Sequence, residues 1–301
     1  MTTTENKEKP TPKDISAALS RYDLVVDILE KLIATLEEKN KDDNRWFIFA
    51  SKIGKKFLTH TLTINQIYSE EVYYNNTNSE RFRFIDTGSM FSLLRVQLEN
   101  YAVLYHLFAD NCKMEEKTLR FKLWQLDGLR TRQAFKRPDD KVIDSIEVEK
   151  SEIDLIISEI KNFSYFKSQP IEIQEQLIKF SMWRFTENSL KNKDKNKRKI
   201  SIEQTITNTG IKTNKIFENW YSHTSTHLHT NFWSVVQNDT LTLDQKITSE
   251  YIGIMMSTFV VSFFIIDFCK IQETARVFYD ALPDNHKAII KSFDSREKTS
   301  H

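Results

Sequence analysis

Three of the seven histidines in this 301-residue chain, His223, His227 and His229, fall within seven residues of one another. Histidine changes charge near neutral pH, which suits it to acid–base chemistry and to metal binding. If the segment is helical, Tyr221, Ser225 and His229 follow one another at four-residue steps and share one face. His223 and His227, also four apart, then form a second row beside the first.

Three interpretations of this segment stay open. In the first, the Tyr221 row hydrogen-bonds to a neighbouring helix and only stabilises the fold. In the second, His229 or His227 is a general acid or base, as in metal-independent RNA cleavage. In the third, His223 and His227 hold zinc, for which their i, i+4 spacing is suitable. No third ligand is evident, and the glutamate that directly follows the first histidine of a zincin helix is missing. We therefore expect no bound metal.

A second polar pair, Arg95 and Glu99, interrupts the otherwise apolar stretch 90–109. The two side chains are four residues apart and can pair on one helix face. Burial of either charge alone would cost several kcal/mol, so the pair must satisfy itself or meet other polar groups. The pair is either a structural clamp to a neighbouring helix, or Arg95 binds an anion such as phosphate while Glu99 orients it or acts as an acid or base.

Both observations lead to one hypothesis about the site. A buried Arg95–Glu99 pair needs further polar partners, and the polar row of the histidine segment can supply them. We expect Arg95, Glu99, Tyr221, Ser225 and His229 to meet in one polar site, and we treat these five as the candidate catalytic residues.

Composition limits the fold class. The chain has 5 Gly and 5 Pro, too few for the many turns of an all-β protein. It is 40% hydrophobic and 28% charged, which is typical of a globular protein. The net charge of +1 argues against a general nucleic-acid coat, although a local basic patch remains possible. Two distant cysteines do not make a disulfide framework, and they favour a reducing cytoplasm.

Apolar periodicity predicts an all-α, multi-helix bundle of about eight helices around a buried central helix at 89–110. That helix should pack against the histidine helix (214–237) and a long apolar helix (243–271). The uncharged stretch 252–266 is shorter than the roughly 20 residues that span a bilayer, so we interpret it as a core helix, with no membrane partner. The expected domains are a disordered tail (1–13), an N-terminal helical pair (14–80), a main bundle (81–293) with a charged linker (191–199), and a tail (294–301).

Basic residues between 113 and 137 form either a nucleic-acid face or, as their interleaved acids favour, a solvated helix face: Lys113, Lys117, Arg120, Lys122, Arg130, Arg132, Lys136 and Arg137. No Gly-rich phosphate loop, Gly-x-Ser-x-Gly elbow or Cys-x-x-Cys pair occurs in the sequence. We therefore expect no cofactor.

The segment SLLRVQLENYAVLYHLF (92–108) resembles the Arg-x3-Glu helix of a bacterial family of helical proteins, domain of unknown function 5677. The second hallmark of that family is a Tyr-x3-Ser-x3-His helix after a short helix that ends in Gly. Here SIEQTITNTGIK (201–212) precedes Tyr221, Ser225 and His229. The resemblance spans roughly residues 85–270.

This resemblance implies an all-helical, bacterial protein without an established activity. The family is likened to the higher-eukaryote-and-prokaryote nucleotide-binding (HEPN-like) bundles, many of which are toxin or antiviral ribonucleases with an Arg-x4–6-His motif. This chain departs from that motif, since its only such spacing runs from Arg296 to His301. Two function classes follow. One is a cytoplasmic effector that acts on RNA or a nucleotide in phage defence or stress. The other is a non-enzymatic module that binds a protein partner or forms a homodimer.

Overall fold

The computed structural model divides into two compact units, residues 1–104 with 210–301 (unit 1) and residues 105–209 (unit 2). Each unit is described by itself. The structure describes residues 10–39, 45–69, 72–75, 81–84, 86–134, 143–213, 217–228, 236, 240–294 and 296.

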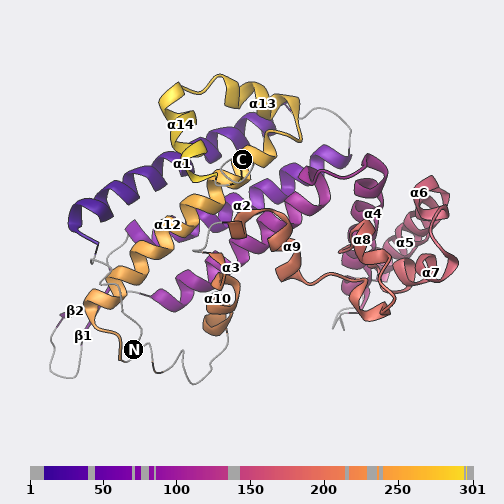
Figure 1. Cartoon of the computed structure of the whole chain (residues 1–301), viewed down its shortest axis with the longest axis horizontal. Coiled ribbons are helices and arrows are strands. Elements are labelled where there is room, and N and C mark those ends of the chain that lie inside the picture. The colour runs from indigo at the N-terminus through magenta and orange to yellow at the C-terminus, as the bar shows by residue number, and fades with distance from the viewer. Residues whose placement is uncertain are drawn as a thin grey trace. The chain divides into compact units, whose positions relative to one another are not determined.

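Unit 1 consists of helices and one short hairpin (Figure 1). Its elements are α1 (Pro12–Lys39), α2 (Arg45–Ser69), β1 (Val72–Asn75), β2 (Arg81–Phe84), α3 (Thr87–Leu104), the 3-10 turn η4 (Ile211–Thr213), α10 (Trp220–Leu228), α12 (Leu243–Phe268), α13 (Glu273–Asp280) and α14 (Asp284–Phe293).

Every secondary-structure element of unit 2 within its described residues is a helix. Its elements are the π-helix η1 (Tyr105–Ala109), α4 (Met114–Gln133), α5 (Ile143–Asn162), α6 (Ser164–Lys167), α7 (Ile171–Lys179), α8 (Glu187–Leu190), the 3-10 turn η3 (Lys195–Lys197) and α9 (Ile202–Asn208).

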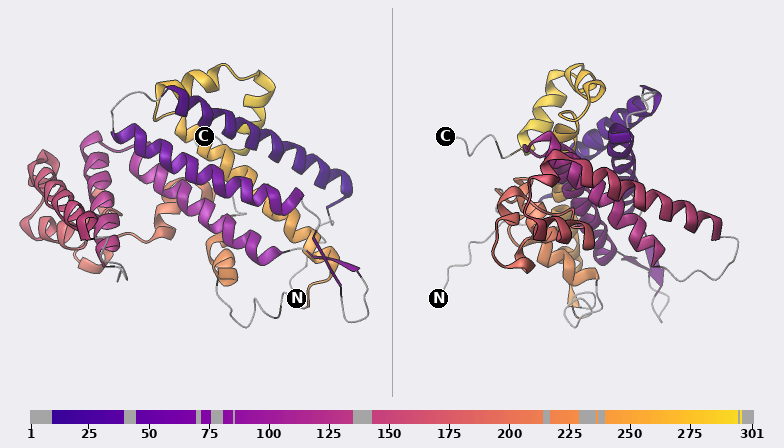
Figure 2. Two further views of the ribbon diagram at one scale, coloured as in Figure 1. Left: turned by 180° about the vertical axis from the view of Figure 1, so that it is seen from behind. Right: turned by 90° about the vertical axis from the view of Figure 1, so that its right-hand side faces the viewer.

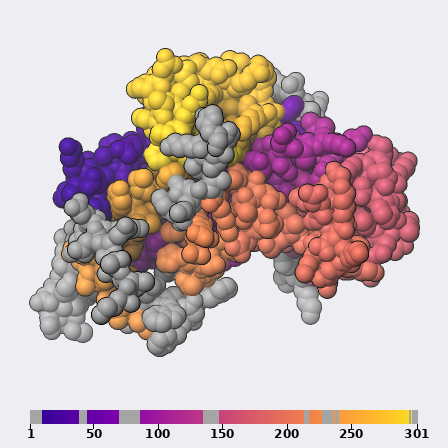
Figure 3. All heavy atoms as spheres, in the orientation of Figure 1, coloured from indigo at the N-terminus to yellow at the C-terminus, as the bar shows by residue number. Residues whose placement is uncertain are grey.

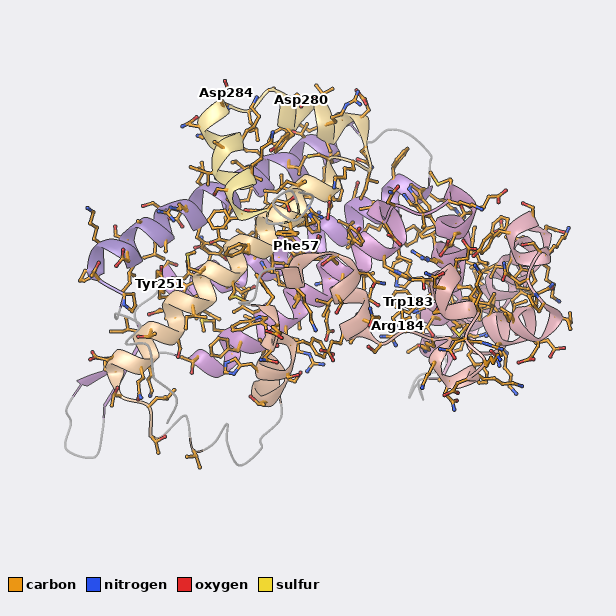
Figure 4. The ribbon with its side chains drawn as sticks, in the orientation of Figure 1. Phe57, Trp183, Arg184, Tyr251, Asp280 and Asp284 are labelled. Carbon is orange, nitrogen blue, oxygen red and sulfur yellow. The ribbon has the colours of Figure 1, made fainter. Side chains whose placement is uncertain are left out.

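The core of unit 1 lies where α1, α2, α3 and α12 pack together, and α2 and α3 run side by side when seen from behind (Figure 2). Phe57 of α2 stacks on Phe264 of α12 with ring centroids 3.9 Å apart, and Phe57 lies well inside these helices in Figure 4. Helix α13 packs on α1, and α14 packs on α12; their atoms form the yellow surface at the top of Figure 3. The expected contacts of α3 with α10 and α12 are confirmed.

Helix α12 is the one helix within the described ranges that is long and apolar enough to cross a membrane. In its most apolar window, 78% of the residues are buried inside the protein. A core helix passes the same test of length and composition, and this degree of burial agrees with the core position expected for 252–266.

Capping side chains explain where several helices begin. The Asp86 carboxylate accepts the backbone N–H of Ser89 at 2.9 Å and caps α3. Thr242 and Gln245 form the expected reciprocal capping box at the start of α12. Ser201 caps α9 by accepting the N–H of Gln204 at 3.0 Å. These starts were readable in the sequence because each cap is made within three residues of the helix.

The all-α class is confirmed, but the details differ from the expected bundle of about eight helices. The described residues contain thirteen α-helices, and the larger number includes short ones such as α6 and α8, which have four residues each. Strands β1 and β2 pair antiparallel, Val72 opposite Phe84, where the sequence indicated the end of a helix and a loop.

The charged segment 191–199, expected as a solvated linker and domain boundary, belongs to unit 2. Arg198 of this segment is buried and donates from Nη1 to Glu172 at 2.8 Å and to Gln176 at 3.0 Å. The expected tail after Phe293 also carries packed residues. Arg296 donates to the fully buried Asp267 at 2.8 Å.

Unit 2 encloses a second ionic group around Arg120. Its guanidinium pairs with Glu116 and, at 2.6 Å, with Asp110, and it also donates to the His106 carbonyl at 3.0 Å. Neither Arg120 nor Glu116 is open to solvent. His106 itself is buried and lies 3.2 Å through Nε2 from the carbonyl of Trp183, a residue labelled beside Arg184 in Figure 4.

A glycine test probes the close approach of α12 to α3 and α2. A Cβ on Gly253 would lie 2.7 Å from Sδ of Met90 and would also collide with the Tyr68 hydroxyl, whereas a Cβ on Gly128 in α4 meets nothing within 4 Å. We expect Gly253→Ala to lower the free energy of unfolding by about 1–3 kcal/mol through overpacking. Gly128→Ala should raise it by about 0.5–1 kcal/mol, because alanine is the better helix former. Urea denaturation measures both, and equal effects would contradict the predicted contact.

A pH test probes His106. Burial, followed by the positive charge of Arg120, lowers the pKa of His106 to about 3. The unfolded histidine binds a proton below about pH 6.5, whereas the folded one does so only near pH 3, so stability must fall as pH falls through this window. Between pH 6.5 and pH 4.5 we expect a loss of about 2–3 kcal/mol that His106→Gln does not suffer. Urea titrations of both proteins at the two pH values measure the difference, and parallel losses would contradict it.

Candidate functional site

The Arg95 pair lies on the part of α3 that faces α10. Helix α3 buries Phe91, Leu94 and Leu98, and this burial leaves Arg95 and Glu99 on an adjoining strip. Their four-residue spacing aligns them, and Arg95 Nε donates to Glu99 Oε1 at 2.9 Å. The pair is therefore local to one helix turn, as the spacing indicated.

Tyr221 joins this pair from the other side of unit 1. Arg95 Nη2 donates to the Tyr221 hydroxyl at 2.7 Å, and the hydroxyl donates to Glu99 Oε1 at 3.4 Å. The Arg95 guanidinium carbon also lies 4.5 Å from the centre of the Tyr221 ring, within cation–π range. The three groups thus form a closed triangle of contacts between residues 126 positions apart in the sequence.

Apolar contacts place Tyr221 in this position. The preceding residue, Trp220, is buried and meets Phe91 of α3 edge to face, with ring centroids 5.4 Å apart. Thr224 is fully buried one turn later, and Phe217 packs edge to face on Phe259 of α12 at 5.6 Å. Because Trp220 and Thr224 fix the inward face of α10, Tyr221 projects along α3 to reach Arg95.

The site is neither sealed nor fully solvated. The Arg95 side chain is 17% exposed and that of Glu99 is 33% exposed. Burial and the negative charge of Glu99 raise the pKa of the Tyr221 hydroxyl, so it is protonated at neutral pH. Arg95 Nη1 makes no hydrogen bond to any residue in the described part of the chain. An anion approaching from solvent would thus meet a guanidinium nitrogen that still has donors to offer.

The other predicted members of the site differ in outcome. Ser225 lies on α10 one turn after Tyr221, but its hydroxyl bonds back to the Tyr221 carbonyl instead of to Arg95 or Glu99. His229 lies outside the described residues, as does the side chain of His227. The prediction that His229 joins the site therefore stays a prediction.

His223 packs against aromatic rings near the site. Its ring lies 5.1 Å from that of Phe91 and 5.5 Å from that of Trp220, centre to centre. Desolvation by these neighbours lowers the pKa of His223, which therefore favours its neutral form. The His227 side chain, one half of the His223–His227 zinc pair, lies outside the described residues. The described residues contain no group of three His, Cys, Asp or Glu side chains placed to hold a metal.

The basic stretch of α4 does not form an open cationic face. Arg120 is buried against its two acids, Lys122 pairs with Glu159 at 2.6 Å, and Arg132 pairs with Glu149 at 2.7 Å. Lys136 and Arg137 lie outside the described residues. These internal pairs favour the structural interpretation of the basic stretch over a nucleic-acid face.

Two ionic groups were missed by reasoning from the sequence. Glu116 and Arg120 carry the same i, i+4 spacing as the Arg95 pair, which is a signal that the amphipathic appearance of α4 concealed. The second group joins Asp267 to Tyr101 at 2.6 Å and to Arg296 at 2.8 Å. Its members come from distant parts of the chain, and no local pattern marks them.

Comparisons of the chain with protein-family models, curated proteins and solved structures found no match. The resemblance to domain of unknown function 5677 and the HEPN-like bundles therefore stays a hypothesis that rests on the quoted motifs.

A double-mutant cycle tests the Arg95–Tyr221 contact. We expect Arg95→Ala and Tyr221→Phe to be coupled by about 1–2 kcal/mol in the free energy of unfolding, because Arg95 and the Tyr221 hydroxyl form a charge-assisted hydrogen bond. Phenylalanine keeps the ring, so the cycle reports on the hydroxyl and not on the cation–π contact. The matched control is Arg95→Ala with Ser225→Ala, whose effects should add, since Ser225 bonds only within α10. Chemical denaturation of the five variants gives both couplings. Additive effects in the Arg95–Tyr221 cycle would contradict the contact.

Proposed function

We propose that unit 1 acts on RNA or a nucleotide, with Arg95 as the residue that binds the phosphate. The observation that carries the proposal is the guanidinium itself. Two of its nitrogens are held by Glu99 and Tyr221, while Nη1 lies at a partly exposed position and makes no hydrogen bond within the described ranges. A guanidinium whose orientation is fixed loses little entropy when it binds a phosphate oxygen, and its planar fork matches phosphate geometry.

The neighbours of Arg95 supply groups for acid–base chemistry. Metal-independent RNA cleavage needs a base that takes the proton of the 2′-hydroxyl and an acid that protonates the leaving 5′-oxygen. In our proposal Glu99 is the base and Arg95 neutralises charge on the phosphate. The acid is His229, eight residues after Tyr221 in the sequence, and Tyr221 holds Arg95 and Glu99 in register. The proposed setting, a cytoplasmic bacterial effector in defence or stress, rests on the resemblance alone.

The alternative function is a non-enzymatic interaction module. It is favoured by the mutual pairing of the three groups, which join α3 to α10 without any ligand. In that case the cluster contributes to stability, and its variants change only folding.

An RNA-binding experiment separates the two functions. Fluorescence anisotropy with a labelled single-stranded RNA should show that Arg95→Ala binds at least about tenfold more weakly than wild type, as expected for a lost hydrogen bond between charged groups. The matched control is Arg276→Ala, which removes one positive charge from unit 1 at a side chain that is 62% exposed and, among the described residues, pairs with Glu273 alone. Glu99→Gln should keep the binding and lose cleavage of the RNA in chelator-containing buffer.

Circular dichroism must show that each variant is folded. If folded Arg95→Ala binds RNA and the nucleotides tested as wild type does, phosphate binding at Arg95 is disproved. If wild type neither binds nor cleaves RNA or nucleotides, the interaction module is the better account.

A further inference from the structure

Unit 2 contains a cavity of about 780 Å³ that the site around Arg95 does not use. Its walls come from the start of α4, from α6, from the start of α7 and from the segment 187–198. These elements all carry labels in Figure 1. Its volume falls within the range of roughly 300–1,000 Å³ that is usual for small-molecule sites.

The acidic side chains in the wall are already engaged. Glu115 accepts the hydroxyl of Ser164 at 2.9 Å, and Glu187 pairs with Lys191 at 2.8 Å. Lys113 and Lys193 also line the cavity, are exposed, and form no ion pair with any residue that the structure describes. The lining thus contains four cationic side chains against two acidic ones, the cations being Lys113, Lys191, Lys193 and Arg198.

Arg198 is the buried cation in the wall of this cavity. The residue is 8% exposed, and what remains accessible lines the cavity. Nε donates to the Asn192 carbonyl at 2.9 Å, and Nη1 donates to Glu172 at 2.8 Å and to Gln176 at 3.0 Å. Nη2 makes no hydrogen bond to a described residue. The guanidinium is thus held in place by three contacts with one nitrogen left to bind a ligand, an arrangement suited to a carboxylate or phosphate.

The remaining wall is partly apolar and contains an unused hydroxyl. Pro170, Ile173 and Leu190 line the cavity, the last two buried. Tyr165 is more than nine-tenths buried in the same wall, and its hydroxyl has no hydrogen-bond partner in the described part of the chain. A ligand for this cavity should therefore combine an anionic group with an apolar, ring-containing body that carries polar atoms.

We propose that the cavity of unit 2 is a binding site for a nucleoside monophosphate. The phosphate would bind Arg198 Nη2 and the ammonium groups of Lys193 and Lys113. The nucleoside would lie against Pro170, Ile173 and Leu190, with Ser168, Gln169 and Asn192 available for hydrogen bonds. The site shares no residue with the Arg95 cluster, so it is independent of the function proposed for unit 1.

Isothermal titration of the full-length protein with adenosine and uridine monophosphates tests this site. Inorganic phosphate and the two nucleosides without phosphate are the comparison probes. At least one monophosphate should bind saturably and more tightly than phosphate or its own nucleoside. Lys193→Ala should weaken that binding about three- to tenfold, and Arg198→Lys more than tenfold, because lysine cannot keep the three holding contacts and the free nitrogen together.

Lys197→Ala is the matched control, since Lys197 belongs to the same basic segment, is 72% exposed and does not line the cavity. It should bind as wild type does. The titrations of wild type and Lys193→Ala are repeated in an Arg95→Ala background, which removes the phosphate-binding residue proposed for unit 1, and the loss caused by Lys193→Ala should persist there. Thermal melts identify a misfolded Arg198→Lys, and the exposed Lys193 provides the test in that case. The proposal is overturned if wild type shows no saturable binding at millimolar ligand, if Lys193→Ala binds as wild type does, or if phosphate alone binds as tightly as both monophosphates.

Discussion

The architecture of unit 1 depends on one constraint, the need of polar side chains on the buried helix α3 to find partners. An unpaired polar group away from water costs on the order of 1–3 kcal/mol, and a charge costs more. Gln97 donates to Thr61 of α2 at 2.8 Å and accepts from Ser257 of α12 at 3.0 Å. Tyr101 donates to Asp267 near the end of α12 at 2.6 Å. These bonds define how α2 and α12 lie on α3 more narrowly than apolar contact alone.

The Arg95 cluster, formed by Arg95, Glu99 and Tyr221, follows the same constraint but lies closer to solvent. Gln97 and Tyr101 are fully buried and satisfied inside the protein, whereas Arg95 and Glu99 lie partly in solvent and, within the described ranges, meet one further partner, Tyr221. A position that is neither sealed nor open is where a charged pair can hold a fixed geometry and still meet a ligand. Burial thus differs between two faces of one helix, and this difference is the physical basis for assigning a structural role to Gln97 and Tyr101 and proposing chemistry for Arg95 and Glu99.

In unit 2, two arginines are among the buried polar groups that need partners. Arg120 and Arg198 are both buried, and each is surrounded by acceptors from several elements. For Arg120 the acceptors include two nearby carboxylates, and these ion pairs neutralise its positive charge within unit 2. For Arg198 one carboxylate, one amide and one carbonyl hold the guanidinium, and the residue lines a cavity. Two similar side chains thus serve different purposes because the number and charge of their partners differ.

The sequence by itself determined the all-α class, the starts of α3, α9 and α12, and the pairing of Arg95 with Glu99. Each of these depends on residues no more than about one turn apart, whose caps and spacing act wherever the helix lies. The same local reasoning placed Tyr221 and Ser225 on one face of a helix. Only the tertiary structure decided that Tyr221 reaches Arg95 while Ser225 turns back to its own backbone.

Tertiary packing also decided that the segment 191–199 belongs to unit 2, that Arg296 binds Asp267, and that a hairpin stands where a loop was expected. The reason is physical. Contacts between distant residues form only when the sum of apolar burial and polar pairing over the whole unit exceeds the entropy of ordering the chain. A charged segment such as 191–199 has the composition of a solvated linker, and it is the acceptors on α7, far away in the sequence, that make the burial of Arg198 favourable.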